Sequence, residues 1–173
     1  MQAPDVQRRL MAIMAGDMVG YSRLMELDEA GTFARLKAHR LELVDPAIAK
    51  YHGRIIKSTG DGILVEFASA AEAVQCALEI QRRMVRRNAD VVPERRIQFR
   101  IGINLGDVIV EEGDVFGDGV NVAARLEQLA DPDGITVSQA VRDQLASRFD
   151  IRFEDLGEQQ VKNINRSIRA FRV

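Results

Sequence analysis

Cysteine is nearly absent from this sequence: Cys76 is the one cysteine among 173 residues. A single thiol can form neither an internal disulfide nor a cysteine metal cluster, so both devices are excluded. The sequence also lacks any apolar run long enough to span a bilayer, and its first residues lack a signal-peptide pattern. We therefore expect a cytoplasmic domain with no membrane contact from this chain.

An excess of either charge is also missing, because 24 Lys and Arg residues face 26 Asp and Glu residues and leave a net charge of -2. This balance gives no general attraction to nucleic acid or to an anionic membrane. The main basic cluster lies at the end of a predicted helix and shortly after it, and has no interleaved aromatic residues: Arg82, Arg83, Arg86 and Arg87 at the end, and Arg95 and Arg96 close behind. Cations are favoured at a helix C-terminus, so we interpret this cluster as a solvated face rather than a nucleic-acid site.

The length and composition fit one globular domain. Hydrophobic residues make up 46% of the chain and charged residues 29%, and neither low-complexity tracts nor repeats interrupt it. A chain of this length can bury a sizeable core. We expect a single domain over residues 1–173, with its core from about residue 9 onward.

Residues 54–67 predict a hairpin in which two apolar runs flank a polar turn. Gly60 and Gly62 allow the backbone conformations that a tight turn needs, and they place Asp61 at its tip. Lys57 lies at the end of the incoming strand. A carboxylate beside a cation can hold a metal and a polar ligand, although Asp is also common in turns for structural reasons alone.

An apolar run at residues 10–15 predicts a strand that is covered on both faces. Asp17 follows it, at the carboxyl end of the strand, where open sheets commonly bind ligands. The alternative is that Asp17 caps the helix that begins near Gly20 or Tyr21. Together with Asp61 on a neighbouring strand, Asp17 would suit Mg²⁺, which is commonly held by one or two carboxylates and substrate phosphates.

A helix is predicted over the next segment, where apolar residues recur at helical spacing: Phe33, Leu36, Leu43, Val44, Ala47 and Tyr51. Arg40 is the exception on this face. Pro46 should kink or restart the helix, because proline lacks an N–H and disfavours α geometry in the residue before it. A second helix should run from about residue 69 to Asn88, with an apolar face that includes Val85.

The second half of the chain predicts another hairpin, with strands at residues 97–103 and 107–110 and a turn at residues 104–106. The element order is strand, helices, hairpin, helix, hairpin, helix, strand, helix and terminal strands. This order contains a βαββαβ arrangement, so it predicts an α+β fold with a ferredoxin-like sheet and helices packed on one face.

Asp118 can cap the last long helix, from about residue 120 to residue 129. Asn121 and Arg125 are four residues apart on it, so they share a face, which we expect to look back towards the preceding loop. The alternative is a pair of surface residues, one of them paired with Glu127 or a neighbouring acid.

Three blocks of the sequence, at residues 15–22, 57–62 and 114–125, resemble the signature blocks of class III nucleotidyl cyclase catalytic domains, most closely the bacterial adenylate/guanylate cyclases. The resemblance covers the chain from about Arg9 to Val173. It implies two divalent ions, Mg²⁺ or Mn²⁺, in each active site. The residues that it assigns to the metals are Asp17, Met18 (through its carbonyl) and Asp61, and those that would cradle the phosphates are Val19, Gly20, Tyr21 and Ser22.

The resemblance also implies roles for residues that face the substrate. Lys57 and Asp114 would read the purine, Asn121 would orient the ribose, Arg125 would stabilise charge on the α-phosphate, and Lys162 would bind the terminal phosphates. In the family these residues face the metals of a partner subunit. The resemblance therefore implies a head-to-tail homodimer with two shared sites.

The predicted purine pair favours ATP as substrate. Adenine presents an acceptor at N1 and a donor at C6, which a lysine donor and an aspartate acceptor complement, whereas guanine presents the reverse. We therefore predict an adenylate cyclase that makes cyclic AMP and pyrophosphate. The alternatives are a guanylate or mixed-specificity cyclase, or a nucleotide-binding dimerisation module without turnover. Asp107 departs from the family pattern, because it stands near where some members keep a phosphate-binding arginine.

Overall fold

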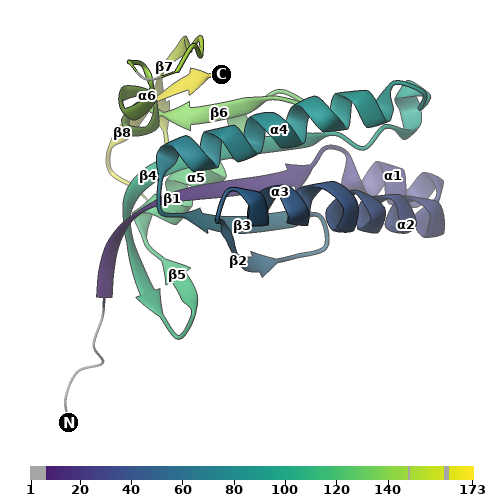
Figure 1. The fold of residues 1–173 in the computed structure, drawn as a ribbon, viewed down its shortest axis with the longest axis horizontal. Coiled ribbons are helices and arrows are strands. Elements are labelled where there is room, and N and C mark those ends of the chain that lie inside the picture. The colour runs from purple at the N-terminus through teal and green to yellow at the C-terminus, as the bar shows by residue number, and fades with distance from the viewer. Residues whose placement is uncertain (1–6, 148, 162–163) are drawn as a thin grey trace.

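The computed structural model describes residues 7–147, 149–161 and 164–173, which form one sheet with helices packed against it (Figure 1). The strands are β1 (Gln7–Met18), β2 (Arg54–Ser58), β3 (Gly62–Phe67), β4 (Phe99–Glu111), β5 (Asp114–Phe116), β6 (Ile135–Ser138), β7 (Glu154–Gln160) and β8 (Ser167–Arg172). The α-helices are α1 (Tyr21–Leu27), α2 (Glu29–His39), α3 (Asp45–Lys50), α4 (Ala70–Asn88), α5 (Asp118–Leu129) and α6 (Gln139–Leu145). A π-helix (Arg40–Val44) joins α2 to α3, and a short 3-10 helix (Pro93–Arg95) precedes β4. No helix of the described residues is long and apolar enough to cross a membrane.

The strands lie in the order β2-β3-β1-β4-β6-β8-β7, and β5 pairs with β4 outside this path. Strand β1 is antiparallel to both β3 and β4. Helices α1 to α3 connect β1 to β2, and α4 connects β3 to β4, so the first four strands have the predicted βαββαβ order. The prediction of an α+β, ferredoxin-like fold is confirmed.

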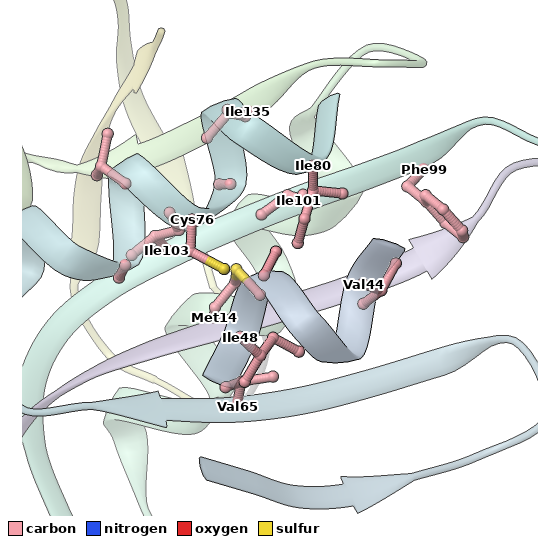
Figure 2. Close-up of a cluster of buried hydrophobic side chains, with 14 of the residues drawn as sticks. Met14, Val44, Ile48, Val65, Cys76, Ile80, Phe99, Ile101, Ile103 and Ile135 are labelled. Carbon is pink, nitrogen blue, oxygen red and sulfur yellow. The ribbon is translucent and has the colours of Figure 1, made fainter. Parts of the chain in front are cut away.

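Helices cover both faces of the sheet. Successive side chains of a strand point to opposite faces, so one strand can contact helices on both sides. On β1, Ala12 and Met14 join a cluster with the helices from α2 to α4 and with α6. Ile13 and Ala15 point the other way and pack with Ala123 of α5. The expectation that the helices lie on one face was therefore wrong. Figure 2 shows part of the larger cluster, in which side chains from several strands and helices meet around Met14 and Cys76.

Two residues assigned to apolar helix faces are exposed to solvent: Phe33 is 60% exposed and Val85 is 55% exposed. A helix shifts its register at the π-helix Arg40–Val44, where the N–H of Asp45 donates to the carbonyl of Arg40. This wider turn lies directly before Pro46, which cannot donate a hydrogen bond and would clash in a regular helix. The predicted interruption at Pro46 is confirmed, and it explains why one periodic face does not run through the whole segment.

Strand β4 is continuous, so the predicted turn at residues 104–106 was wrong. It pairs with β1 without a break from Phe99 to Val110, and the chain turns instead at Glu112 and Gly113, both with positive φ. Polar Asn104 is buried in this strand because its Nδ2 donates to the carbonyl of Gly119, 3.2 Å away. The side-chain amide of Asn104, a residue type common in turns, thus finds its hydrogen-bond partner 15 residues away in the sequence.

Helix α5 begins at Asp118, and Gly117 is its N-cap with a φ of 114°. Its N-terminus has no hydrogen bond from a side-chain cap, so the prediction that Asp118 caps it was wrong. Asp118 lies in the first turn instead, where a negative charge is favoured by the helix dipole.

The close crossing of α5 over β4 depends on Gly102. A Cβ at this position would lie 2.1 Å from the backbone nitrogen of Glu127 and 2.5 Å from the carbonyl oxygen of Ala123. Backbone atoms of a helix cannot move out of the way individually, so any larger residue must push the whole helix off the sheet.

We expect Gly102→Ala to lower the free energy of unfolding by about 3 kcal/mol, the upper part of the range for overpacked cores. Gly16→Ala is the matched control on β1, because its Cβ would meet Ile63 Cγ2 at 3.4 Å, an ordinary contact. Urea unfolding followed by circular dichroism measures both. Equal stability of the two variants would show that α5 does not need this close approach.

Candidate active site

Asp17 lies one residue before the end of β1, opposite Gly62 of β3 on one side and Arg100 of β4 on the other. The Arg100 side chain reaches it with two hydrogen bonds, from Nη2 to Oδ2 at 3.1 Å and from Nε to Oδ1 at 3.3 Å. Helix α1 is preceded by Gly20 as N-cap and has no hydrogen bond from a side-chain cap. The alternative that Asp17 caps this helix was therefore wrong.

Asp61 occupies the turn between β2 and β3, as predicted, and this turn lies beside the end of β1. Its carbonyl accepts a hydrogen bond from the N–H of Met18 at 3.2 Å, and within the turn the N–H of Thr59 donates to the carbonyl of Gly62 at 2.9 Å. The prediction that Asp17 and Asp61 come from neighbouring strands agrees with this register.

The predicted phosphate loop runs from the end of β1 into α1. The N–H of Val19 already donates to the carbonyl of Gln98 at 2.8 Å, so it is not free for a phosphate. Gly20 has a left-handed conformation with a φ of 64°, and Tyr21 and Ser22 form the first turn of α1. A Cβ at Gly60 would lie 3.3 Å from the Tyr21 hydroxyl, so this loop approaches the turn that carries Asp61.

Glu127 of α5 is a third acid at this place, and sequence reasoning did not assign it to the site. Burial, followed by a hydrogen bond and charge repulsion from Asp17, raises the pKa of Glu127 to about 8. Asp61 raises this pKa further, and Arg100 opposes the shift. A helix places residues two apart on nearly opposite flanks, so the assignment of Arg125 to one flank could have indicated that Glu127 faces the other.

The two predicted purine-reading residues lie together on the surface: Lys57 Nζ is 3.6 Å from Asp114 Oδ1. Their side chains are 50% and 41% exposed, so both can still contact a ligand. Strand β5 is held next to β2 by a further contact, from Arg54 Nη1 to the carbonyl of Gly113 at 3.3 Å. Residues that are far apart in the sequence thus form one cation and carboxylate pair.

Arg125 contacts strand β7 rather than Asp17 or Asp61. Its Nε donates to the carbonyl of Gln160 at 3.0 Å, and its Nη1 approaches Gln128 Oε1 at 3.4 Å. The expectation that it looks back to the loop before α5 was wrong, and Glu127 is not its partner. Asn121 is exposed, one turn earlier on α5. Lys162, predicted to bind terminal phosphates, lies outside the described residues.

Asp107 lies far from the acidic end of β1. It pairs with Leu10, seven residues before Asp17 along this strand, which corresponds to about 23 Å. Asp107 therefore does not contribute to this end of the sheet in its own chain. Arg100, which pairs with Asp17, is the cation that the fold places there.

The donor set at the end of β1 fits a hard divalent ion. Among the described residues no group of three or more His, Cys, Asp or Glu side chains is arranged to hold a metal. Asp17, Asp61 and the Met18 carbonyl supply oxygen ligands only, and Mg²⁺ commonly uses one or two carboxylates and completes its shell with water and phosphate. A cavity of about 600 Å³ near the start of α5 is lined by none of these three ligands.

Comparisons with known proteins agree with this arrangement. Residues 6–172 match the family model of the adenylate and guanylate cyclase catalytic domain. A putative adenylate cyclase 3 of Rhizobium meliloti is 49% identical over 171 residues, 99% of this chain and 29% of that protein. An adenylate cyclase of Streptomyces coelicolor is 35% identical over 143 residues, 81% of this chain and 35% of that protein. The chain thus spans about a third of the length of these relatives.

A solved structure gives the same result for the fold. The adenylate/guanylate cyclase/hydrolase of Silicibacter pomeroyi is 52% identical, covers 97% of this chain and 98% of its own, and superposes with a TM-score of 0.92. The family match includes all three sequence blocks on which the resemblance was based. The chain belongs to the family of adenylate and guanylate cyclase catalytic domains.

Proposed function

We propose that the chain is an adenylate cyclase that converts ATP to 3′,5′-cyclic AMP and pyrophosphate at sites shared by two copies of the chain. The arrangement of α5 carries this proposal. Glu127 faces Asp17, whereas Arg125 bonds the carbonyl of Gln160 on the opposite flank of the helix. Residues two apart differ by about 160° around a helix axis, so Arg125 cannot serve the acids of its own chain. A second, head-to-tail copy would supply the acids with which Arg125 acts.

The pair of Lys57 and Asp114 supports ATP as the substrate. Lys57 can donate to N1 of adenine, and Asp114 can accept from its amino group. Guanine would set a donor against the lysine and an acceptor against the carboxylate, and such unpaired polar groups penalise binding strongly. Asp114 is therefore the feature that speaks against the alternative of a guanylate or mixed-specificity cyclase.

In the proposed mechanism, the ribose 3′-hydroxyl attacks its own α-phosphate in line, and pyrophosphate leaves. Asp17, Asp61 and the Met18 carbonyl would hold Mg²⁺ or Mn²⁺ ions, two in each site, which would lower the pKa of this hydroxyl and bind the leaving phosphates. Asn121 orients the ribose. Arg125 of the second copy stabilises negative charge on the α-phosphate, for which a planar guanidinium is well shaped.

The terminal phosphates would be bound by two cations and by backbone N–H groups. Lys162 and the backbone of residues 20–22 are proposed from the family pattern, without Val19, whose N–H already donates to the carbonyl of Gln98. Arg100 is added because it lies beside Asp17. Arg100 can pair with a phosphate oxygen when an ion occupies the carboxylate. All of the residues assigned to chemistry are present, which argues against the alternative of a dimerisation module without turnover.

Purified chain with ATP and Mn²⁺ should form cyclic AMP, and GTP should give less cyclic product. Activity per chain should fall on dilution below the dimer dissociation constant.

Asp17→Ala and Lys57→Ala should each be nearly inactive alone, and mixing them should restore part of the activity, because one hybrid site keeps both native contributions. Absence of cyclic AMP at high protein concentration would refute the function, and a mixture no more active than its components would refute the shared site.

Arg125→Ala should lower kcat by about 10²–10³-fold with a smaller change in KM, because the lost contact strengthens in the transition state. Gln128→Ala is the matched control on α5, since it removes a neighbour of the guanidinium at 3.4 Å but leaves the guanidinium itself. Steady-state kinetics with ATP separates the two parameters. A variant at position 125 that keeps more than about a third of the activity would remove Arg125 from the mechanism.

Glu127→Gln should change how stability depends on pH. The pKa of Glu127 is raised to about 8 in the folded chain and is ordinary when unfolded, so the folded state holds an extra proton between about pH 4.5 and pH 8. In wild type, the contribution of Glu127 to the free energy of unfolding is fully present below this pH range and is lost as the pH rises through it. In EDTA, the melting temperature of Glu127→Gln relative to wild type should therefore rise with pH, whereas exposed Glu94→Gln should track wild type. Parallel curves for Glu127→Gln would show that Glu127 ionises normally.

A further inference from the structure

Arg40 is the one charged residue on the apolar face predicted for the helical segment before β2, and the cyclase residues assigned above leave it without a role. It is the first residue of the π-helix. Its Nε donates to Asp45 Oδ1 at 3.1 Å, and its Nη1 donates to Ser58 Oγ at 2.9 Å. The Arg40 side chain is 24% exposed, so most of it is buried.

The π-helix explains how Arg40 and Asp45 meet. A regular α-helix places residues five apart about 140° from each other around its axis. The i to i+5 hydrogen bond between the carbonyl of Arg40 and the N–H of Asp45 stacks these two residues one above the other. The Asp45 carboxylate can then hold the guanidinium by its Nε and present Nη1 to Ser58.

The turn from Ser58 to Asp61 has few other restraints. Among the described residues, Arg40 is the only side chain that hydrogen-bonds this segment. The backbone contributes the bonds from Met18 to Asp61 and from Thr59 to Gly62, and Ser58 pairs with Ile63 at the end of β2. A cavity of about 30 Å³ lies behind the turn, bounded by Arg40, Asp61 and apolar residues of the core, so packing from that side is incomplete. Hydrogen bonds must therefore fix the position of the turn.

We propose that Arg40 is a positioning residue for the cyclase reaction: oriented by Asp45, it holds the β2–β3 turn through Ser58 and so places Lys57 and Asp61. This inference rests on the proposed function, in which these two residues serve purine recognition and metal binding. Arg40 touches neither substrate nor metal. Its effect passes through Ser58, which lies directly after Lys57 and three residues before Asp61.

The test compares Arg40→Met, which keeps the length of the side chain but removes its hydrogen bonds, with Arg40→Lys, Ser58→Ala and the double variant Arg40→Met/Ser58→Ala. Arg40→Met and Ser58→Ala should each lower kcat/KM for ATP about tenfold, the scale of a small misplacement of catalytic groups. The double variant should be no worse than Arg40→Met, because both changes break one contact. Arg40→Lys should recover part of the loss.

Hydrogen–deuterium exchange of residues 59–62 gives a readout that does not depend on catalysis. Exchange in this turn should speed up about tenfold in Arg40→Met and in Ser58→Ala, because opening of the turn becomes easier. Arg87→Met is the matched control, since it breaks the pair with Glu42 on the same π-helix but does not reach the turn. Its exchange in the turn and its kcat/KM should equal those of wild type.

Two results would overturn the inference: unchanged exchange in the turn, or losses in kcat/KM that multiply in the double variant. If Arg40→Met does not fold, Ser58→Ala alone decides, because Ser58 is exposed and its hydroxyl is the end of the contact. A wild-type chain that makes no cyclic product would refute the proposed function, whereas the exchange measurement would still test the hold of Arg40 on the turn.

Discussion

The ion pair between Arg100 and Asp17 is the contact on which the rest of the site depends. Strands β1, β3 and β4 and helix α5 bring Asp17, Asp61 and Glu127 into one region, and like charges so close together repel each other. The fold reduces this repulsion in two ways: Arg100 neutralises Asp17, and burial favours the protonated form of Glu127. The folded chain can therefore hold these three acids close together.

The close approach of α5 to the sheet also determines where Arg125 points. Gly102 allows α5 to approach β4 until Glu127 reaches the acids. Helical geometry then sends Arg125 to the opposite flank, where the Gln160 carbonyl holds it. A chain with this crossing separates its acids from Arg125, the proposed transition-state cation, and the proposed dimer follows from that separation. Gly102 thus influences the proposed shared site through the packing of the backbone, although Gly102 itself has no catalytic side chain.

Local patterns predicted the βαββαβ order and the break at Pro46, because each depends on residues close in the sequence. The neighbouring positions of Asp17 and Asp61 then followed from this order of elements. They failed where a distant partner decides. Asn104 was interpreted as a turn residue, yet Gly119 satisfies its side chain inside a continuous strand. Glu127 was considered only as a surface partner, because its burial depends on the absence of a side chain at Gly102. The pairing of Lys57 with Asp114 agrees with the resemblance, which supplied information that spacing alone does not contain.

In the proposed dimer the turn after β2 belongs to two sites at once. Asp61 serves the metals of its own chain, while Lys57, four residues earlier, serves the purine in the site completed by the partner. A shift of this turn would displace a metal ligand from one site and a purine contact from the other. The two sites of a symmetric dimer would therefore weaken together, and the hold of Arg40 on Ser58 would act on both. This is a physical reason to anchor the turn to the helical layer, since packing behind it leaves a cavity.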